Sequence, residues 1–110
     1  MSMRSFVFLE TPVFTRRIRE LVDDEDYRRL QVRLLLDPEA GDLIAGSGGL
    51  RKLRMAVGGS GKRGGARVVY YWIGARSRIY MLLVYAKNER DDLGEEQLKS
   101  LRSLVKQELG

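Results

Sequence analysis

The fold of this chain is decided by two runs of residues, Ala-Arg-Val-Val-Tyr-Tyr-Trp-Ile at positions 66–73 and Arg-Ile-Tyr-Met-Leu-Leu-Val-Tyr-Ala at positions 78–86. Both runs are rich in β-branched and aromatic residues, which favour strands. The segment between them, Gly-Ala-Arg-Ser, predicts a hairpin turn. Because both runs are apolar on both faces, we expect them at the centre of a sheet that is partly covered on each side.

A third strand is expected upstream of this hairpin. Between Lys52 and Val57, apolar side chains alternate with Lys52, Arg54 and Ala56, a pattern typical of a half-buried strand with a basic outer face. Five glycines within residues 58–65 predict a loop that joins it to the run at 66–73. The three strands therefore form an antiparallel meander. Residues 37–49, which contain Pro38 and four glycines, are predicted to be a loop.

The remaining segments predict one more strand and three helices. The run Phe6–Leu9 is a short strand, and Thr11-Pro12 begins a helix with a capping residue followed by proline. A second helix begins with Asp23 or Asp24 as its cap and ends at Asp37-Pro38. The apolar positions of these two helices and of a C-terminal one follow helical spacing: Phe14, Ile18, Leu21 and Val22; Tyr27, Leu30, Leu34 and Leu35; Leu98, Leu101, Leu104, Val105 and Leu109.

The order of elements is strand, helix, helix, three strands, helix. We therefore predict one α+β domain over residues 1–110, with a small antiparallel sheet, an N-terminal helical hairpin and a C-terminal helix.

Composition narrows the chemistry. The chain has no Cys, which excludes disulfides, thiolate nucleophiles and zinc fingers, and no His, which removes the usual general base. No stretch of 18 apolar residues exists and residues 1–10 lack the apolar core of a secretory signal, so we expect no membrane association and a cytoplasmic location.

The net charge of +5 conceals a strong segregation. Residues 47–90 carry ten basic residues and one acidic residue, and no acidic residue lies between Asp42 and Glu89. Solvated surfaces ordinarily mix both signs of charge. The pattern predicts a basic face and a polyanionic partner.

Strand reversal brings distant basic residues to one end of the meander. The residues expected to converge there are Lys52, Arg54, Lys62, Arg63, Arg67 and Lys87. The alternative is that Arg67 and Lys87 extend from strand ends into solvent, and that Lys62 and Arg63 serve only solubility. Arg76 and Arg78 belong to the opposite end.

Aromatic residues in the central strands could form a platform for stacking bases, but such residues are more often core. Tyr70, Tyr71 and Trp72 are therefore expected in the core. Tyr85 is the aromatic residue nearest the cationic site, and we expect it to pack rather than stack.

The glycine-rich loop is not a phosphate-binding loop of the Walker type. The required first Gly falls on Ala56, Arg63 stands where Ser or Thr is needed, and a strand follows instead of a helix. The basic half also lacks clustered carboxylates for a metal.

A cationic site without His or metal suits RNA cleavage by a 2′-hydroxyl, because the substrate supplies the nucleophile. A lysine crowded by other cations can become a usable base.

Three stretches together resemble HigB toxins of the RelE/ParE superfamily of type II toxin–antitoxin modules, and the likeness is nearest to the HigB-2 branch. These are Gly46-Ser-Gly-Gly-Leu-Arg-Lys-Leu-Arg54, Gly61-Lys-Arg-Gly-Gly-Ala-Arg-Val-Val-Tyr-Tyr71 and Tyr85-Ala-Lys-Asn-Glu89. The resemblance implies the RelE-like fold and a ribosome-dependent mRNA endonuclease that needs no metal or other cofactor. It also implies a cognate helix-turn-helix antitoxin of the HigA type, through which alone the pair would bind operator DNA.

The resemblance assigns roles to individual residues. Arg67 would stabilise the phosphate, Lys52, Arg54 and Lys62 would bind it and supply a base, and Lys87 would support the leaving group or contact rRNA. The residues assigned to RNA or ribosome binding are Arg51, Arg63, Asn88 and Arg90. Asn88 stands where RelE-like enzymes have a second basic residue, and Asp92, Leu93 and Gly94 occupy the region of their C-terminal catalytic Tyr, so Lys62 or Arg63 would substitute.

Two other functions remain open. ParE-like toxins share the fold and inhibit DNA gyrase, but they generally lack this set of basic residues. A non-catalytic nucleic-acid-binding module would explain the charge but not the spacing.

Overall fold

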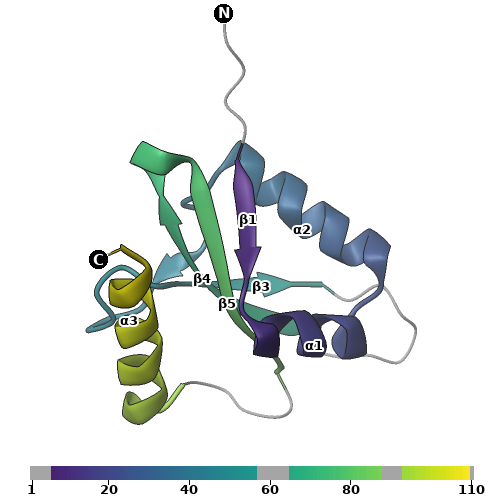
Figure 1. The fold of residues 1–110 in the computed structure, drawn as a ribbon. Helices are drawn as coiled ribbons and strands as arrows, with labels where there is room; N and C mark the ends of the chain where they lie inside the picture. The colour runs from purple at the N-terminus through teal and green to yellow at the C-terminus, as the bar shows by residue number, and fades with distance from the viewer. Residues whose placement is uncertain (1–5, 57–64, 88–92, 110) are drawn as a thin grey trace, which may run out of the picture.

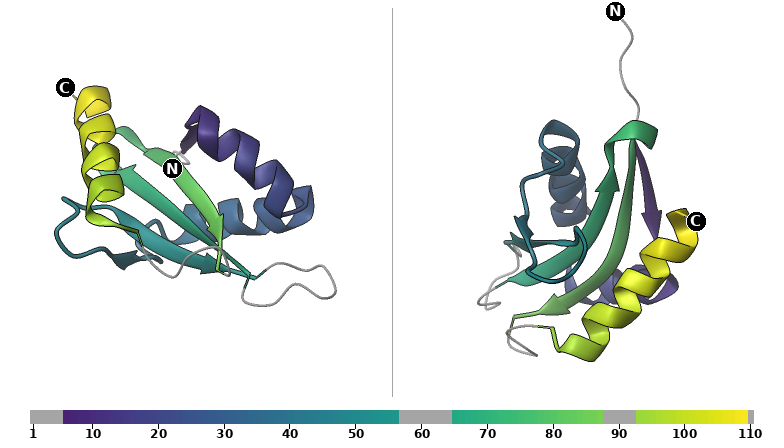
Figure 2. Two further views of the ribbon diagram at one scale, coloured as in Figure 1. Left: turned by 90° about the horizontal axis from the view of Figure 1, so that it is seen from below. Right: turned by 90° about the vertical axis from the view of Figure 1, so that its left-hand side faces the viewer.

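The computed structural model of the chain describes residues 6–56, 65–87 and 93–109. Its elements in chain order are β1 (Val7–Glu10), α1 (Pro12–Leu21), α2 (Asp24–Leu36), β2 (Asp42–Leu43), β3 (Arg51–Met55), β4 (Ala66–Ile73), a short 3₁₀ turn (Gly74–Arg76), β5 (Arg78–Ala86) and α3 (Glu95–Leu109). Figures 1 and 2 show one sheet between two helical layers, with α1 and α2 on one face and α3 on the other. The predicted α+β class is confirmed, and the order of elements matches the prediction apart from one additional short strand.

The strands are ordered β1-β5-β4-β3-β2. The antiparallel meander of β3, β4 and β5 is confirmed, and β4 and β5 are central, as their apolar composition predicted. Two details were wrong. The sheet is mixed, because β1 pairs parallel with β5, and a short strand, β2, lies within residues 37–49 and pairs with Arg51 and Lys52. A bridge of two residues needs no apolar run, so composition does not reveal it.

Both N-terminal helices begin at the predicted caps. The Thr11 hydroxyl accepts a hydrogen bond from Phe14 N at 3.0 Å and donates one to Leu82 O at 2.8 Å. Leu82 is free to accept because the β4–β5 register skips it at an irregularity. Asp23 caps α2 by accepting a hydrogen bond from Asp26 N at 2.8 Å, which settles the choice between Asp23 and Asp24. The caps therefore fix the entry of both helices.

Each face of the sheet buries its own apolar cluster. Phe14, Ile18, Leu30 and Leu34 pack with alternate residues of β3, β4 and β5, whereas Leu98, Leu101, Leu104 and Val105 of α3 pack on the opposite face. The prediction of Leu35 as a core residue was wrong: its side chain is 42% exposed, because the buried stripe of α2 continues through Leu30 and Leu34.

None of the helices within the described ranges is long and apolar enough to cross a membrane. Residues 57–64, which include most of the predicted glycine-rich loop, and residues 88–92 lie outside the described residues.

Candidate active site

A transverse row of polar side chains crosses the sheet on the face that α3 covers. Arg54 of β3 is paired with Arg67 of β4, and Arg67 is paired with Tyr85 of β5. Their neighbours Leu53, Met55, Ala66 and Val68 belong to the cluster under α1 and α2, so residues 54 and 67 project to the other face. Directly paired residues lie about 5 Å apart at Cβ. The register therefore places two arginines side by side.

Lys52 lies on the same face, two residues before Arg54. It is paired with Val69 on one side and with Asp42 of β2 on the other. The strand alternation predicted from Lys52, Leu53, Arg54 and Met55 is thus confirmed, and it aims Lys52 and Arg54 at one face.

Lys52, Arg54 and Arg67 line a hollow of about 450 Å³ beside the edge of the sheet that β2 forms. Its lining residues are Arg33, Ala40, Asp42, Lys52, Leu53, Arg54 and Arg67. A volume of this size lies within the range of pockets that hold small ligands. The lining includes four cationic residues, Arg33, Lys52, Arg54 and Arg67. Such residues suit the oxygens of a phosphodiester, since a guanidinium can hold two such oxygens in a fork.

Among the residues that the structure describes, no carboxylate neutralises the two paired arginines. Within the described ranges, neither Arg54 nor Arg67 has a carboxylate oxygen within 4.0 Å, whereas Arg17, Arg29 and Arg51 each do. The Nε atom of Arg67 is buried and has no hydrogen-bond partner among the same residues. Placing like charges opposite each other destabilises a sheet. An anion from outside the chain would relieve that repulsion.

Arg51 lies next to this hollow but is held by the loop that follows α2. Its Nη1 atom donates hydrogen bonds to Gly41 O at 2.7 Å and to Glu39 O at 3.2 Å, and its guanidinium lies 3.6 Å from the Glu39 carboxylate. The side chain is only 15% exposed. Its assignment as an RNA-binding residue stays a prediction, and the contacts show that it fixes the loop over residues 38–41.

Tyr70 holds the same loop from inside the core. Its hydroxyl donates to Pro38 O at 2.7 Å and accepts from Gly41 N at 2.9 Å, and burial raises the pKa of Tyr70. Gly41 fits because a Cβ there would lie 2.8 Å from the Tyr70 ring. Tyr70 and Arg51 together position Ala40 and Asp42 at the rim of the hollow.

Lys87 lies at the same end of the sheet as Arg67. Its backbone N–H donates to Gly65 O at 3.2 Å, next to the Ala66–Ala86 pair, so the predicted convergence of the ends of β4 and β5 is confirmed. Lys87 does not line the hollow. The other predicted site residues, Lys62, Arg63, Asn88 and Arg90, lie outside the described residues.

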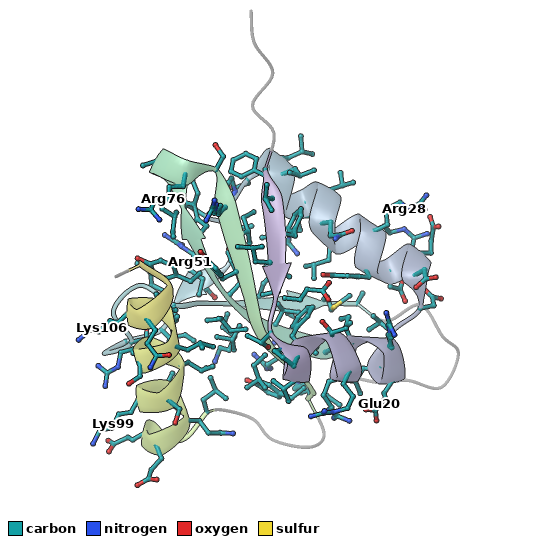
Figure 3. All side chains as sticks on the ribbon, viewed as in Figure 1. Glu20, Arg28, Arg51, Arg76, Lys99 and Lys106 are labelled. Atoms are coloured by element: carbon teal, nitrogen blue, oxygen red, sulfur yellow. The ribbon has the colours of Figure 1, made fainter. Side chains whose placement is uncertain are left out.

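Arg76 and Arg78 are exposed at the far end of β4 and β5, as predicted. Figure 3 shows Arg76 there, and it shows Lys99 and Lys106 of α3 pointing outward. The aromatic residues pack as expected: Tyr70 is wholly buried, Tyr85 is 3% exposed, and Tyr71 and Trp72 lie against opposite clusters. No base-stacking platform forms from these four side chains.

Sequence reasoning missed two members of the hollow, Arg33 and Asp42. Arg33 lies on α2, whose sequence pattern indicates only an amphipathic helix. Its position beside the sheet depends on the path of the chain between α2 and β3, which the pattern does not reveal. Asp42 carried one signal, since it is the last acidic residue before the long acid-free stretch. Within the described ranges no group of three or more potential metal-ligating residues occurs.

A family model described as the RelE toxin of the RelE/RelB toxin–antitoxin system matches residues 10–110. Among solved structures, a mutant of the E. coli toxin RelE in the free state is similar, with a TM-score of 0.57 and 16% identity over 88% of this chain and 93% of that one. At this level of identity the structural likeness concerns the fold.

Proposed function

This chain belongs to the RelE toxin family, and from that premise we propose that it is a toxin that cuts mRNA on the ribosome. The observation that carries the proposal is the hollow lined by Lys52, Arg54 and Arg67, in which neither arginine has a carboxylate within 4.0 Å among the residues that the structure describes. Such a site binds a phosphodiester and stabilises charge that develops on it.

The proposed reaction is the attack of an mRNA 2′-hydroxyl on the adjacent phosphorus, without a metal or other cofactor. Arg67 stabilises the phosphorane-like transition state, Lys52 and Arg54 hold the nonbridging oxygens, and Lys87 supports the leaving oxygen or contacts rRNA. The remaining predicted residues, Arg51, Lys62, Arg63, Asn88 and Arg90, contact RNA or the ribosome. In this proposal the cationic residues bind the RNA backbone, and the ribosome aligns the codon.

We also propose the finer identity that the motifs indicate. The glycine–basic stretch ending at Arg54 and the Tyr85–Glu89 stretch support the HigB-type branch. The matching partner is a HigA-type helix-turn-helix antitoxin, which carries operator DNA binding for the pair. The activity on translated mRNA belongs in the cytoplasm.

Induction of the toxin in cells, followed by mapping of mRNA 5′ ends, tests the activity. We expect cuts at fixed codon positions within translated messages. Intact messages with stalled replication would instead support gyrase inhibition, and intact messages with normal replication would support a binding module.

Arg67→Ala tests the site. We expect it to lower cleavage about 10²–10³-fold and to relieve growth arrest, while capture of the toxin by its antitoxin is retained. The matched control is Arg76→Ala, which removes an exposed arginine from the opposite end of the same strand pair. Toxicity that survives Arg67→Ala would remove Arg67 from the site.

A further inference from the structure

One carboxylate lies among the cations of the hollow. Asp42 of β2 is exposed, and its backbone is paired with that of Lys52. It lines the 450 Å³ hollow together with Arg33, Lys52, Arg54 and Arg67, and it also lines the neighbouring hollow beside Leu93. Asp42 is thus an acidic residue beside four basic ones in the lining of this hollow.

The Asp42 carboxylate is not committed to a protein partner. Within the described part of the chain it makes no hydrogen bond, and no basic group lies within 4.0 Å of it. Other carboxylates near arginines are engaged, as in Asp26–Arg29 at 3.2 Å and Glu39–Arg51 at 3.6 Å. A negative charge in a phosphate-binding site weakens phosphate binding. Its presence there therefore calls for a chemical role.

Asp42 is also held in place. The loop before it is anchored by the Tyr70 hydroxyl, which bonds Pro38 O and Gly41 N, and by the Arg51 guanidinium, which bonds Gly41 O. β2 then pairs Asp42 with Lys52. A proton-transfer group must be positioned relative to the reacting atoms, and these contacts restrain the backbone that carries the Asp42 side chain.

We propose that the Asp42 carboxylate is the general base of the cleavage reaction, an inference that rests on the proposed function. The carboxylate takes the proton of the 2′-hydroxyl as the O2′–P bond forms. The P–O5′ bond breaks, and the leaving 5′-oxygen receives a proton from water or from a lysine ammonium. The products are a 2′,3′-cyclic phosphate and a 5′-hydroxyl, with no change in oxidation state.

The composition of the hollow favours a carboxylate in this role. Lysine and arginine side chains carry their protons at neutral pH and accept no more, whereas an aspartate is ionised there and accepts one. The charged residues that line the hollow with Asp42 are Arg33 from α2, Lys52 and Arg54 from β3, and Arg67 from β4. These four cations bind the phosphate, and Asp42 takes the proton, so no lysine needs to be neutral.

The test uses the full-length toxin with ribosomes programmed with an mRNA that carries its preferred codon. We expect Asp42→Asn to lower the single-turnover cleavage rate at saturating ribosomes about 10²–10⁴-fold. Ribosome affinity should stay unchanged or rise, because a negative charge is removed. The deficit should narrow as pH rises from about 7 to about 9, since hydroxide replaces the missing base. Asp42→Glu should cleave faster than Asp42→Asn, and Asp24→Asn, on the far side of the sheet, should match wild type.

Other outcomes overturn the inference. If the Asp42→Asn variant cleaves mRNA at a rate within threefold of wild type, Asp42 is not the general base. A deficit that stays constant with pH shows that Asp42 only shapes or charges the hollow. An unchanged rate with an altered codon preference shows that it reads a base instead. If wild-type toxin cuts no mRNA in this assay, the proposed function itself fails, whatever the variants do.

Discussion

The hydroxyl of Tyr70 offers a direct test of how the loop over residues 38–41, beside the hollow, is held in place. Tyr70→Phe removes one oxygen from a wholly buried side chain and breaks two hydrogen bonds, to Pro38 O at 2.7 Å and from Gly41 N at 2.9 Å. Each hydrogen bond contributes about 1 kcal/mol net, and a buried group left without a partner costs about 1–3 kcal/mol. We expect the free energy of unfolding to fall by about 2–3 kcal/mol.

This loss is large enough to measure by calorimetry or urea denaturation. For a chain of 110 residues, an entropy of unfolding of about 2.1 cal/mol/K per residue converts 2 kcal/mol into a decrease in Tm of about 9 °C. Tyr71→Phe is the matched control. It makes the same chemical change at the next residue of β4, where the hydroxyl has no hydrogen bond among the described residues, and it should alter stability by less than about 0.5 kcal/mol.

The functional consequence follows from the position of the loop. If Tyr70 holds Ala40 and Asp42 at the hollow, Tyr70→Phe should also slow mRNA cleavage at temperatures where the variant is still folded. Equal Tm values for Tyr70→Phe and Tyr71→Phe would show that the loop is held by other contacts. A large stability loss with full cleavage activity would show that the loop does not position the site.

Two further predictions concern pH and salt. Burial raises the pKa of both Tyr27 and Tyr70 above 10.0, and the hydrogen bond from Tyr27 to Glu10 adds to the effect at Tyr27. The unfolded chain therefore loses these protons first, so the free energy of unfolding should fall as pH rises above about 10. In urea titrations, the variant with both tyrosines replaced by Phe should show a smaller decline with pH. An equal decline would contradict the role of Tyr27 and Tyr70 in this pH dependence. Ribosome association should weaken with salt, and Arg54→Ala should reduce the slope of log affinity against log salt by about 1, while Arg76→Ala leaves it unchanged. An identical slope for wild type and Arg54→Ala would exclude Arg54 from the RNA-contacting surface.

The parts of the fold that the sequence predicted are those governed by local chemistry. Thr11 and Asp23 cap their helices because hydroxyl and carboxylate oxygens accept the free N–H groups of a first turn. The alternation along β3 places Lys52 and Arg54 on one face for the same local reason. The parallel pairing of β1 with β5 has no local signal, because it depends on how the helical hairpin returns the chain to the sheet.

The part of the site that could be predicted from the sequence is the part that the reversal of chain direction between β3, β4 and β5 brings together. The order of three antiparallel strands is enough to bring Arg54 opposite Arg67 and Lys87 near the start of β4. It does not bring in Arg33, which reaches the hollow from α2, nor does it show that Arg51 bonds Gly41 O instead of facing solvent. Those placements depend on the loop between α2 and β3, whose anchor is a tyrosine in β4.

The acidic residues of the chain explain why the hollow stays cationic. They are concentrated in the helices and the loop after α2, where Glu20, Asp26 and Glu39 each engage an arginine. Within the described part of the chain, the Arg54–Arg67 pair has no such partner, and the repulsion between its like charges destabilises the sheet. A polyanion that binds between them relieves that repulsion and gains charge-assisted hydrogen bonds. Among the described residues, Asp42 has no ion-pair partner, so in the proposed mechanism its carboxylate is available to take the proton of the 2′-hydroxyl.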